Sequence, residues 1–291
     1  MDQCVGCRLV ELNDAVQRAT IPVALLYPAT GPERPEQFGP YTLDVAPNAP
    51  PIGYHLPLVV LSHRNNGTPW AYRDLARHLV RAGFVVALPE HPGNSRSDNS
   101  LAGSLANLES RPRHISRVID AAFADAVLQS HLAPNSAGVI GHSVGGYTAL
   151  AVAGGRPWAG AHESPDGKPR PVHVAPDSRV RALVLLAPAR PWFLPEGSLA
   201  EVRVPILMRR GERDEITPAS HAELVKRGVR NPAIIDHNAI PGAGHFSFMS
   251  TFPPAMTRQD FPPSQDPDGF DRTKLHPSLH ADILAFLERD L

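Results

Sequence analysis

The feature that most constrains the fold of this chain is a short apolar strand followed by a Gly-x-Ser-x-Gly turn, within residues 136–147. Ser143 is the central residue of the turn, and Gly141 and Gly145 flank it. A sharp turn from strand to helix needs glycine wherever a Cβ atom would collide with neighbouring backbone. The helix of small residues that follows puts Ser143 at a helix N-terminus, where free N–H groups can stabilise an oxyanion. The pattern therefore predicts an exposed, nucleophilic serine hydroxyl.

Length and charge narrow the function classes. The 291 residues suit a single α/β domain spanning 1–291, and the net charge is −1 without long runs of one sign. We therefore expect no nucleic-acid partner and no electrostatic membrane adhesion. The chain has no long uncharged apolar window and no apolar leader, so we also expect no stable membrane insertion. A cytoplasmic location is predicted, although a removed signal peptide would leave the same picture. The oligomeric state stays open.

The two cysteines, Cys4 and Cys7, form a C-x-x-C near the N-terminus. A zinc site would need more ligands, and a redox C-x-x-C is expected at the start of a helix after a strand. Neither context is present. We interpret the pair as incidental, in a frayed terminus, and keep a metal or redox role as the alternative.

Short apolar runs without alternation are typical of parallel strands buried on both faces. Here they alternate with amphipathic helical patterns, which predicts βαβ units with right-handed crossovers. We expect an α/β fold with a mostly parallel central sheet, helices on both faces and an antiparallel N-terminal margin. The expected strands cover 8–13, 20–27, 58–61, 84–88, 136–140, 180–187, 204–208 and 233–240; the expected helices cover 70–82, 113–132 and 277–290, with others after Ser143 and from Thr217 and Pro218, where Thr217 is the expected N-cap.

Three stretches lack clear periodicity. Residues 28–57 form a connection rich in Pro and Gly, with an edge strand expected at 41–46, and Pro22 also suits an edge strand. Residues 156–178 and 246–276 are interpreted as loop insertions that could cover a site.

A serine hydroxyl is a weak nucleophile near neutral pH, so a histidine must take its proton and an acid must orient that histidine. Asp214 and His245 each stand in a loop shortly after a predicted strand. Since ligands of open α/β sheets bind beyond the carboxyl ends of the strands, these side chains can meet Ser143 there. Glu212 and Glu215 are the nearest alternatives to Asp214. The sequence thus predicts a catalytic triad of Ser143, Asp214 and His245.

Several motifs together resemble the dienelactone-hydrolase-like and platelet-activating-factor-acetylhydrolase-like branch of the α/β-hydrolases. They are Leu-Ser-His63, Gly-Phe-Val-Val-Ala-Leu-Pro-Glu-His-Pro-Gly93, Gly-His-Ser143-Val-Gly-Gly and Gly-Ala-Gly-His245. The resemblance implies the α/β-hydrolase fold, whose chain order of nucleophile, acid and histidine the predicted triad satisfies. It also implies a serine carboxylester hydrolase that uses no cofactor and no metal.

In this family the loop after the first parallel strand donates one N–H to the oxyanion, and the residue after the nucleophile donates the other. The resemblance therefore nominates Arg64 and Val144. Many relatives have His-Gly where this chain has His63-Arg64, and dienelactone hydrolases proper use cysteine where this chain has Ser143. Our hypothesis is that the Arg64 side chain selects substrates that carry a carboxylate or another hydrogen-bond acceptor. The alternative is that it points to solvent.

Side chains beside these motifs are candidate substrate contacts: His63, His142, Trp192, Phe193 and Phe246. For Trp192 and Phe193, ordinary packing is an equal alternative. His91 could line the rim of the site or cap a loop.

The predicted function is hydrolysis of a small-molecule carboxylic ester or lactone through an acyl-enzyme on Ser143. The same triad would also serve an amidase or peptidase, or an acyltransferase if water is excluded. A more remote alternative is a non-catalytic binding module on a hydrolase scaffold. The sequence does not name the acyl group or the leaving group.

Overall fold

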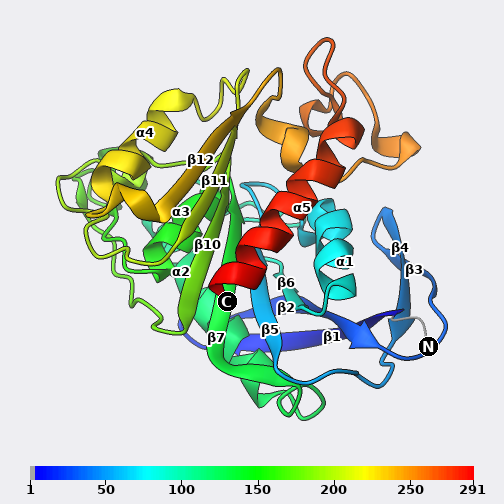
Figure 1. The fold of residues 1–291 in the computed structure, drawn as a ribbon. Coiled ribbons are helices and arrows are strands. Elements are labelled where there is room, and N and C mark those ends of the chain that lie inside the picture. Colours follow the sequence, from blue (N-terminus) through cyan, green and yellow to red (C-terminus); the bar gives the residue numbers. More distant parts are fainter. Residues whose placement is uncertain (1–3) are drawn as a thin grey trace.

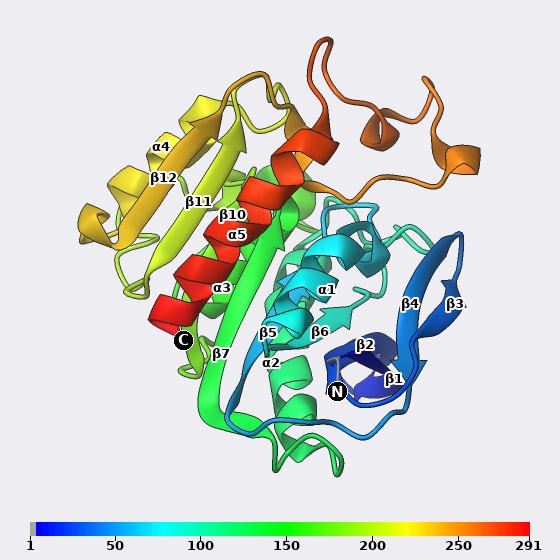
Figure 2. The ribbon, with the colours of Figure 1, turned by 45° about the vertical axis from the view of Figure 1, so that its right-hand side comes forward.

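The computed structural model describes residues 4–291. Within them, ten strands form one sheet in the order β12-β11-β10-β7-β5-β6-β2-β1-β4-β3 (Figures 1 and 2). The strands are β1 Cys4–Asp14, β2 Ala19–Ala29, β3 Arg34–Phe38, β4 Tyr41–Pro47, β5 Leu56–Ser62, β6 Val85–Pro89, β7 Leu132–His142, β10 Val180–Leu186, β11 Ile206–Gly211 and β12 Ile235–Ile240. The helices are α1 Arg73–Arg81, α2 Leu105–Ala124, α3 Val144–Val152, α4 Ala219–Gly228 and α5 Arg272–Asp290.

The six strands from β12 to β6 pair in parallel, and β2 joins β6 antiparallel. Beyond β2, the strand β1 pairs antiparallel with it, β4 pairs in parallel with β1, and β3 closes the edge antiparallel to β4. This arrangement confirms the expected α/β fold with a mostly parallel sheet and an antiparallel N-terminal margin.

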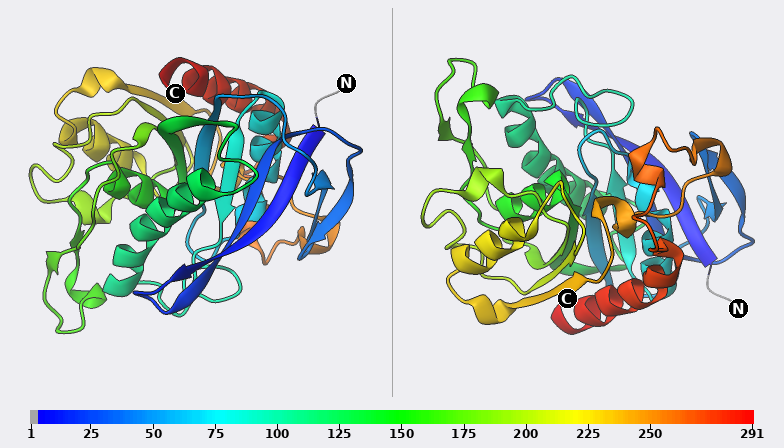
Figure 3. Two further views of the ribbon diagram at one scale, coloured as in Figure 1. Left: turned by 90° about the horizontal axis from the view of Figure 1, so that it is seen from below. Right: turned by 90° about the horizontal axis from the view of Figure 1, so that it is seen from above.

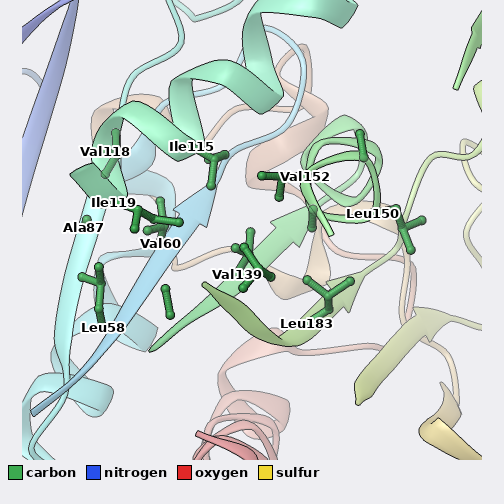
Figure 4. Packing of buried hydrophobic residues seen from close by; sticks show 14 of the residues in the cluster. Leu58, Val60, Ala87, Ile115, Val118, Ile119, Val139, Leu150, Val152 and Leu183 are labelled. Carbon is green, nitrogen blue, oxygen red and sulfur yellow. The ribbon is translucent and has the colours of Figure 1, made fainter. Parts of the chain in front are cut away.

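Helices cover both faces of the sheet (Figure 3). Alternate residues of a strand point to opposite faces, so β5 directs Leu58 and Val60 into one core and Val59 and Leu61 into the other. Side chains of α2, α3 and α4 fill the first core, part of which Figure 4 shows, and those of α1 and α5 fill the second. The two cores fix the central strands, whose carboxyl ends carry the candidate site.

Helix α2 corrects the predicted range of 113–132. It begins at Leu105, with Ser104 as N-cap, and Pro112 lies in its interior and not in its first turn. An interior proline cannot donate to the carbonyl four residues earlier. Here the hydroxyl of Tyr147, which belongs to α3, donates to that Leu108 carbonyl at 2.9 Å. The helix continues through Pro112 because a tertiary contact satisfies this acceptor.

Other boundaries also differ from the predictions. Helix α5 begins at Arg272, so Pro277 again lies inside a helix. Helix α4 begins at Ala219 with Pro218 at the N-cap position, so Thr217 is not the cap. Strand β2 lies between β1 and β6, so Pro22 is not on an edge strand; it stands just before Val23, where the pairing with β6 begins.

The N-terminus is not frayed from Cys4 onward, as β1 begins there and its two cysteines are buried. Cys4 packs into one core and Cys7 into the other, so their side chains lie on opposite faces of the sheet. Burial raises the pKa of Cys7 to about 12. The two thiols therefore do not form a joint site.

The two predicted insertions contain little regular structure. Residues 156–178 hold the short strands β8 Trp158–Ala159 and β9 Arg170–Pro171, and 246–276 holds several 3-10 turns before α5. Figure 1 shows the second segment, in orange, beyond the upper ends of α1 and α5. No helix in residues 4–291 has the length and apolar character needed to cross a membrane.

Candidate active site

Ser143 lies at the junction of β7 and α3 with φ 57° and ψ −118°. A non-glycine residue at positive φ is strained. The strain is held by backbone bonds on both sides, because the Ser143 N–H donates to the Leu186 carbonyl at 3.0 Å and the Ser143 carbonyl accepts from the Ala189 N–H at 2.8 Å. Strand β10, which pairs with β7, and the loop that follows it thus fix the turn.

The flanking glycines are required by close backbone contacts. A Cβ at Gly141 would lie 2.1 Å from the carbonyl oxygen of Gly145, and a Cβ at Gly145 would lie 2.0 Å from the carbonyl oxygen of Ser62. Both glycines thus stand where a Cβ would collide with backbone, as the sequence pattern predicts, and the turn packs against the end of β5.

Asp214 and His245 form a buried pair. His245 Nδ1 lies 2.8 Å from Asp214 Oδ2, and the two side chains are 5% and 0% exposed. The other carboxylate oxygen of Asp214 accepts the N–H groups of Ile216 at 2.9 Å and Thr217 at 2.8 Å. Burial disfavours the charge on Asp214, yet the bonds from His245 and Thr217 outweigh it and lower the carboxyl pKa. An ionised Asp214 fixes the proton of His245 on Nδ1 and leaves Nε2 as the free base.

Thr217 is a member of this cluster that the sequence did not reveal. Its hydroxyl oxygen lies 2.6 Å from Asp214 Oδ2, 3.1 Å from the Ala187 carbonyl oxygen and 3.2 Å from His245 Nδ1. A hydroxyl has one proton to donate, and the shorter contact with an ionised acceptor assigns it to the Asp214 carboxylate. The sequence predicts only a helix-capping role for Thr217, because Thr before Pro is a common signal for a helix start.

The turn that holds His245 contacts the Ser143 turn directly. His142, the residue before Ser143, lies with its ring centroid 4.9 Å from that of His245, and its Nε2 donates to the His245 carbonyl at 2.9 Å. Within residues 4–291 the Ser143 hydroxyl makes no hydrogen bond to His245 at 3.5 Å or less. Such bonds are often long before a substrate binds. The three predicted triad residues are thus held in neighbouring segments, with the Asp–His pair formed.

The loop after β5 carries the predicted donor Arg64. Its backbone N–H donates to the Tyr72 hydroxyl at 3.3 Å, so this N–H already has a partner inside the protein. The next N–H, of Asn65, has no acceptor among the described residues, and the Asn65 side chain is held by Asn94 Nδ2 at 2.5 Å. Val144 is the first residue of α3, where backbone N–H groups lack helical partners.

His63 and His142 are not substrate contacts, in contrast to the prediction, because both are fully buried. His63 Nδ1 bonds the Arg64 carbonyl at 2.8 Å and its Nε2 accepts the His91 N–H at 3.1 Å. His142 uses Nδ1 with the Tyr72 hydroxyl at 2.7 Å and Nε2 with His245. Burial lowers the pKa of both imidazoles well below the usual value, so both are neutral structural groups.

Of the three aromatic side chains predicted as substrate contacts, only Phe246 lies beside the triad. Phe193 is 2% exposed and packs with Tyr147 in the core, at the edge of a cavity of about 530 Å³ that no triad residue lines. Trp192 donates from Nε1 to Glu163 at 2.6 Å, which anchors the 156–178 segment. Phe246 does reach the site, since its ring stands edge-on to that of His245 at 5.2 Å.

His91 does not line the rim. It is fully buried and bonds the Ser62 hydroxyl at 2.9 Å, beneath the loop after β5.

The Arg64 side chain is half-buried and packs against Phe246, and its Nη1 donates to the Asn65 carbonyl at 2.7 Å. Its guanidinium carbon is 5.3 Å from the centre of the Phe246 ring, and its Nε is buried without a hydrogen-bond partner. Burial, together with nearby Arg96, lowers the pKa of Arg64. Among the described residues neither arginine forms a salt bridge. Within residues 4–291, no group of three or more His, Cys, Asp or Glu side chains is arranged to hold a metal ion.

Comparison with known proteins agrees with this geometry. The family model "Serine aminopeptidase, S33" matches residues 55–196, a range that includes Ser143. A ferulic acid esterase from Streptomyces cinnamoneus has a similar structure, with a TM-score of 0.73 at 18% identity over 99% of this chain and 90% of that one. A dienelactone hydrolase from Anabaena variabilis has a TM-score of 0.57 at 16% identity over 98% and 99% of the two chains. No curated protein matches.

The chain therefore has the α/β-hydrolase fold, as its motifs indicated. With the matched family taken together with the fold, it is a hydrolase of the α/β type.

Proposed function

We propose that this protein hydrolyses carboxylic esters or lactones of small molecules through an acyl-enzyme on Ser143. The observation that carries the proposal is the buried Asp214–His245 pair, at 2.8 Å, beside a serine held in a strained turn. That combination supplies an oriented base next to a hydroxyl at a helix N-terminus.

The reaction proceeds in two halves. The Ser143 oxygen bonds to the substrate carbonyl carbon while its proton passes to His245 Nε2. The tetrahedral intermediate collapses, the bond to the leaving oxygen breaks, and His245 returns the proton to that oxygen. Water then attacks the acyl-enzyme with His245 again as base, and the acid leaves as the Ser143 hydroxyl is restored. Asp214 stabilises the imidazolium that forms in each half.

We propose the N–H groups of Val144 and Asn65 as the oxyanion donors. Asn65 takes the place of the predicted Arg64 because the Arg64 N–H is directed to Tyr72 and the Asn65 N–H has no acceptor. Asn65→Pro removes the N–H, and Asn65→Ala keeps it while losing the same side-chain bond to Asn94. The proline variant should lose about 10²–10³-fold in kcat relative to the alanine variant. Equal kcat values would exclude Asn65 as a donor.

For the substrate, we propose that Arg64 favours esters that carry a negative charge. The support is its position over Phe246, an unpartnered Nε and the absence of a salt bridge in residues 4–291. Arg64→Gly should lower kcat/KM for anionic esters and leave neutral esters of the same size little changed. Unchanged selectivity would remove the idea.

Peptide or amide hydrolysis is the second candidate, favoured by the aminopeptidase description of the matched family. It uses the same triad, but His245 must protonate an amine as it leaves. An acyltransferase would differ by an acceptor other than water. A panel of paired ester and amide substrates with the same acyl group, with and without added alcohol, separates the three.

The decisive test compares wild type and Ser143→Ala on a chromogenic ester panel of varied acyl length. We expect ester turnover and fluorophosphonate labelling in wild type, and the loss of both in Ser143→Ala by several orders of magnitude. A variant that keeps the wild-type rate, or a wild type that neither turns over nor labels, would contradict the proposal.

A further inference from the structure

A buried arginine lies beneath the site and takes no part in the chemistry described above. Arg111, on α2, is fully buried, and no carboxylate in residues 4–291 forms a salt bridge with it. Burial lowers its pKa to about 9, which still leaves a cation at neutral pH. An uncompensated buried charge is costly. The fold therefore retains this guanidinium against a stability penalty.

The bonds of Arg111 converge on the two segments that hold the oxyanion donors. Its Nη2 donates to the Ser62 hydroxyl at 3.1 Å, at the end of β5, and to the His63 carbonyl, in the loop that follows. Its Nε donates to the Thr148 hydroxyl at 3.0 Å, in the helix that begins at Val144. Each contact joins α2 to a segment beside Ser143.

A fourth bond reaches Asn65 through one intermediary. Arg111 Nη1 donates to Asn94 Oδ1 at 2.7 Å, and Asn94 Nδ2 donates to the Asn65 side chain at 2.5 Å. All the acceptors that Arg111 bonds directly are buried. The loop that carries the proposed donor is thus tied to one rigid, planar group.

The same arginine begins a chain of bonds that ends at His245. The peptide whose carbonyl accepts from Arg111 presents its N–H, that of Arg64, to the Tyr72 hydroxyl at 3.3 Å. That hydroxyl bonds His142 Nδ1 at 2.7 Å, and His142 Nε2 bonds the His245 carbonyl at 2.9 Å.

The direction of every proton in this chain is determined. A carbonyl only accepts, so His142 Nε2 carries the proton of the neutral ring, and Nδ1 must accept from Tyr72. Tyr72 therefore accepts from the Arg64 N–H. Bonds aligned head to tail in a dry interior polarise one another, and here a cation stands at the donor end.

We propose that Arg111 is a positioning residue that aligns the oxyanion loop with Ser143 and His245 and holds a positive charge behind the developing oxyanion. The inference rests on the proposed function. It predicts an effect on the transition state and not on substrate binding.

The test measures kcat and KM for Arg111→Met and Arg111→Lys, with Arg209→Met as matched control. Arg209 is a buried arginine too, but it is paired with Asp236 at 2.9 Å and lies outside the site. We expect Arg111→Met to lose about 10- to 100-fold in kcat with little change in KM, because misaligned groups fail in the transition state. Arg111→Lys keeps the positive charge but not the planar guanidinium group, so its kcat should lie between those of wild type and Arg111→Met.

A second readout separates positioning from plain stability. Millimolar guanidinium should restore part of the kcat of Arg111→Ala, and sodium chloride at equal ionic strength should not. The inference is wrong if Arg111→Met keeps the wild-type kcat. It is also wrong if the kcat of Arg111→Met falls no further than that of Arg209→Met, because the fall would then reflect only a smaller fraction of folded, active protein.

If the Arg111 variants do not fold, Tyr72→Phe decides. It removes one hydroxyl from the middle of the chain, and a fall in kcat at constant KM supports the inference, whereas wild-type kcat overturns it. Failure of the proposed function looks different, because wild type itself would then neither hydrolyse esters nor react with a fluorophosphonate.

Discussion

Thr217 offers a sharp test of how the acid of the triad is held. The carboxylate of Asp214 has four donors, which are two backbone N–H groups, His245 and the Thr217 hydroxyl at 2.6 Å. Thr217→Val replaces the hydroxyl with a methyl group of the same shape, and Thr217 is 3% exposed, so water has little access to take its place. The variant removes one charge-assisted bond and leaves the triad residues in place.

The cost follows from that single bond. A hydrogen bond to a charged group contributes about 1.5–3 kcal/mol. An unfolding entropy of about 2.1 cal/mol/K per residue makes this a fall of about 2–5 °C in Tm for a chain of this length. Because the same carboxylate orients His245, we also expect a fall of roughly 10-fold in kcat with KM nearly unchanged.

The assay pairs differential scanning calorimetry with ester kinetics, and Thr217→Ser is the control. Serine keeps the hydroxyl and loses only a methyl group, so it should stay close to wild type in kcat. If valine and serine variants have the same kcat, the hydroxyl does not position Asp214 and the reasoning fails.

Two further predictions concern stability. Tyr147→Phe leaves the Leu108 carbonyl without its 2.9 Å donor beside Pro112, so unfolding free energy should fall by about 1–3 kcal/mol in a denaturant titration, and an unchanged value would mean that α2 satisfies this carbonyl in another way. The second prediction concerns four buried imidazoles, those of His63, His91, His114 and His142. Burial is the main cause of their lowered pKa values, so all four are neutral in the folded protein. The unfolded chain takes up protons below about pH 6.5 and the folded chain does not, so each imidazole should cost up to about 1.4 kcal/mol of stability per pH unit below that point. A Tm that stays constant between pH 7 and pH 5 would contradict this.

The sequence predicted the parallel strands and the fold because buried strands and the Gly-x-Ser-x-Gly turn have strong local signals. The predictions of helix boundaries were wrong where tertiary contacts override the preferences of the local sequence. Pro112 indicated a helix start, yet α2 runs through it because Tyr147, thirty-five residues away, bonds the carbonyl that proline leaves free. No local pattern around Pro112 contains that information.

The same reason explains which site residues the sequence could reveal. Ser143, Asp214 and His245 each follow a predicted strand, so topology alone suggests that they meet, and the structure places Asp214 against His245. Arg111 lies in the middle of an amphipathic helix, where an arginine is normally a solvent-facing residue. Its burial becomes visible only in the fold, where the end of β5 brings Ser62 and His63 to it and α3 brings Thr148. The local pattern thus predicts an exposed Arg111, whereas the fold buries it and bonds it to the end of β5 and to α3, the two segments beside the site. A stabilising role explains this burial less well than a role in aligning those two segments.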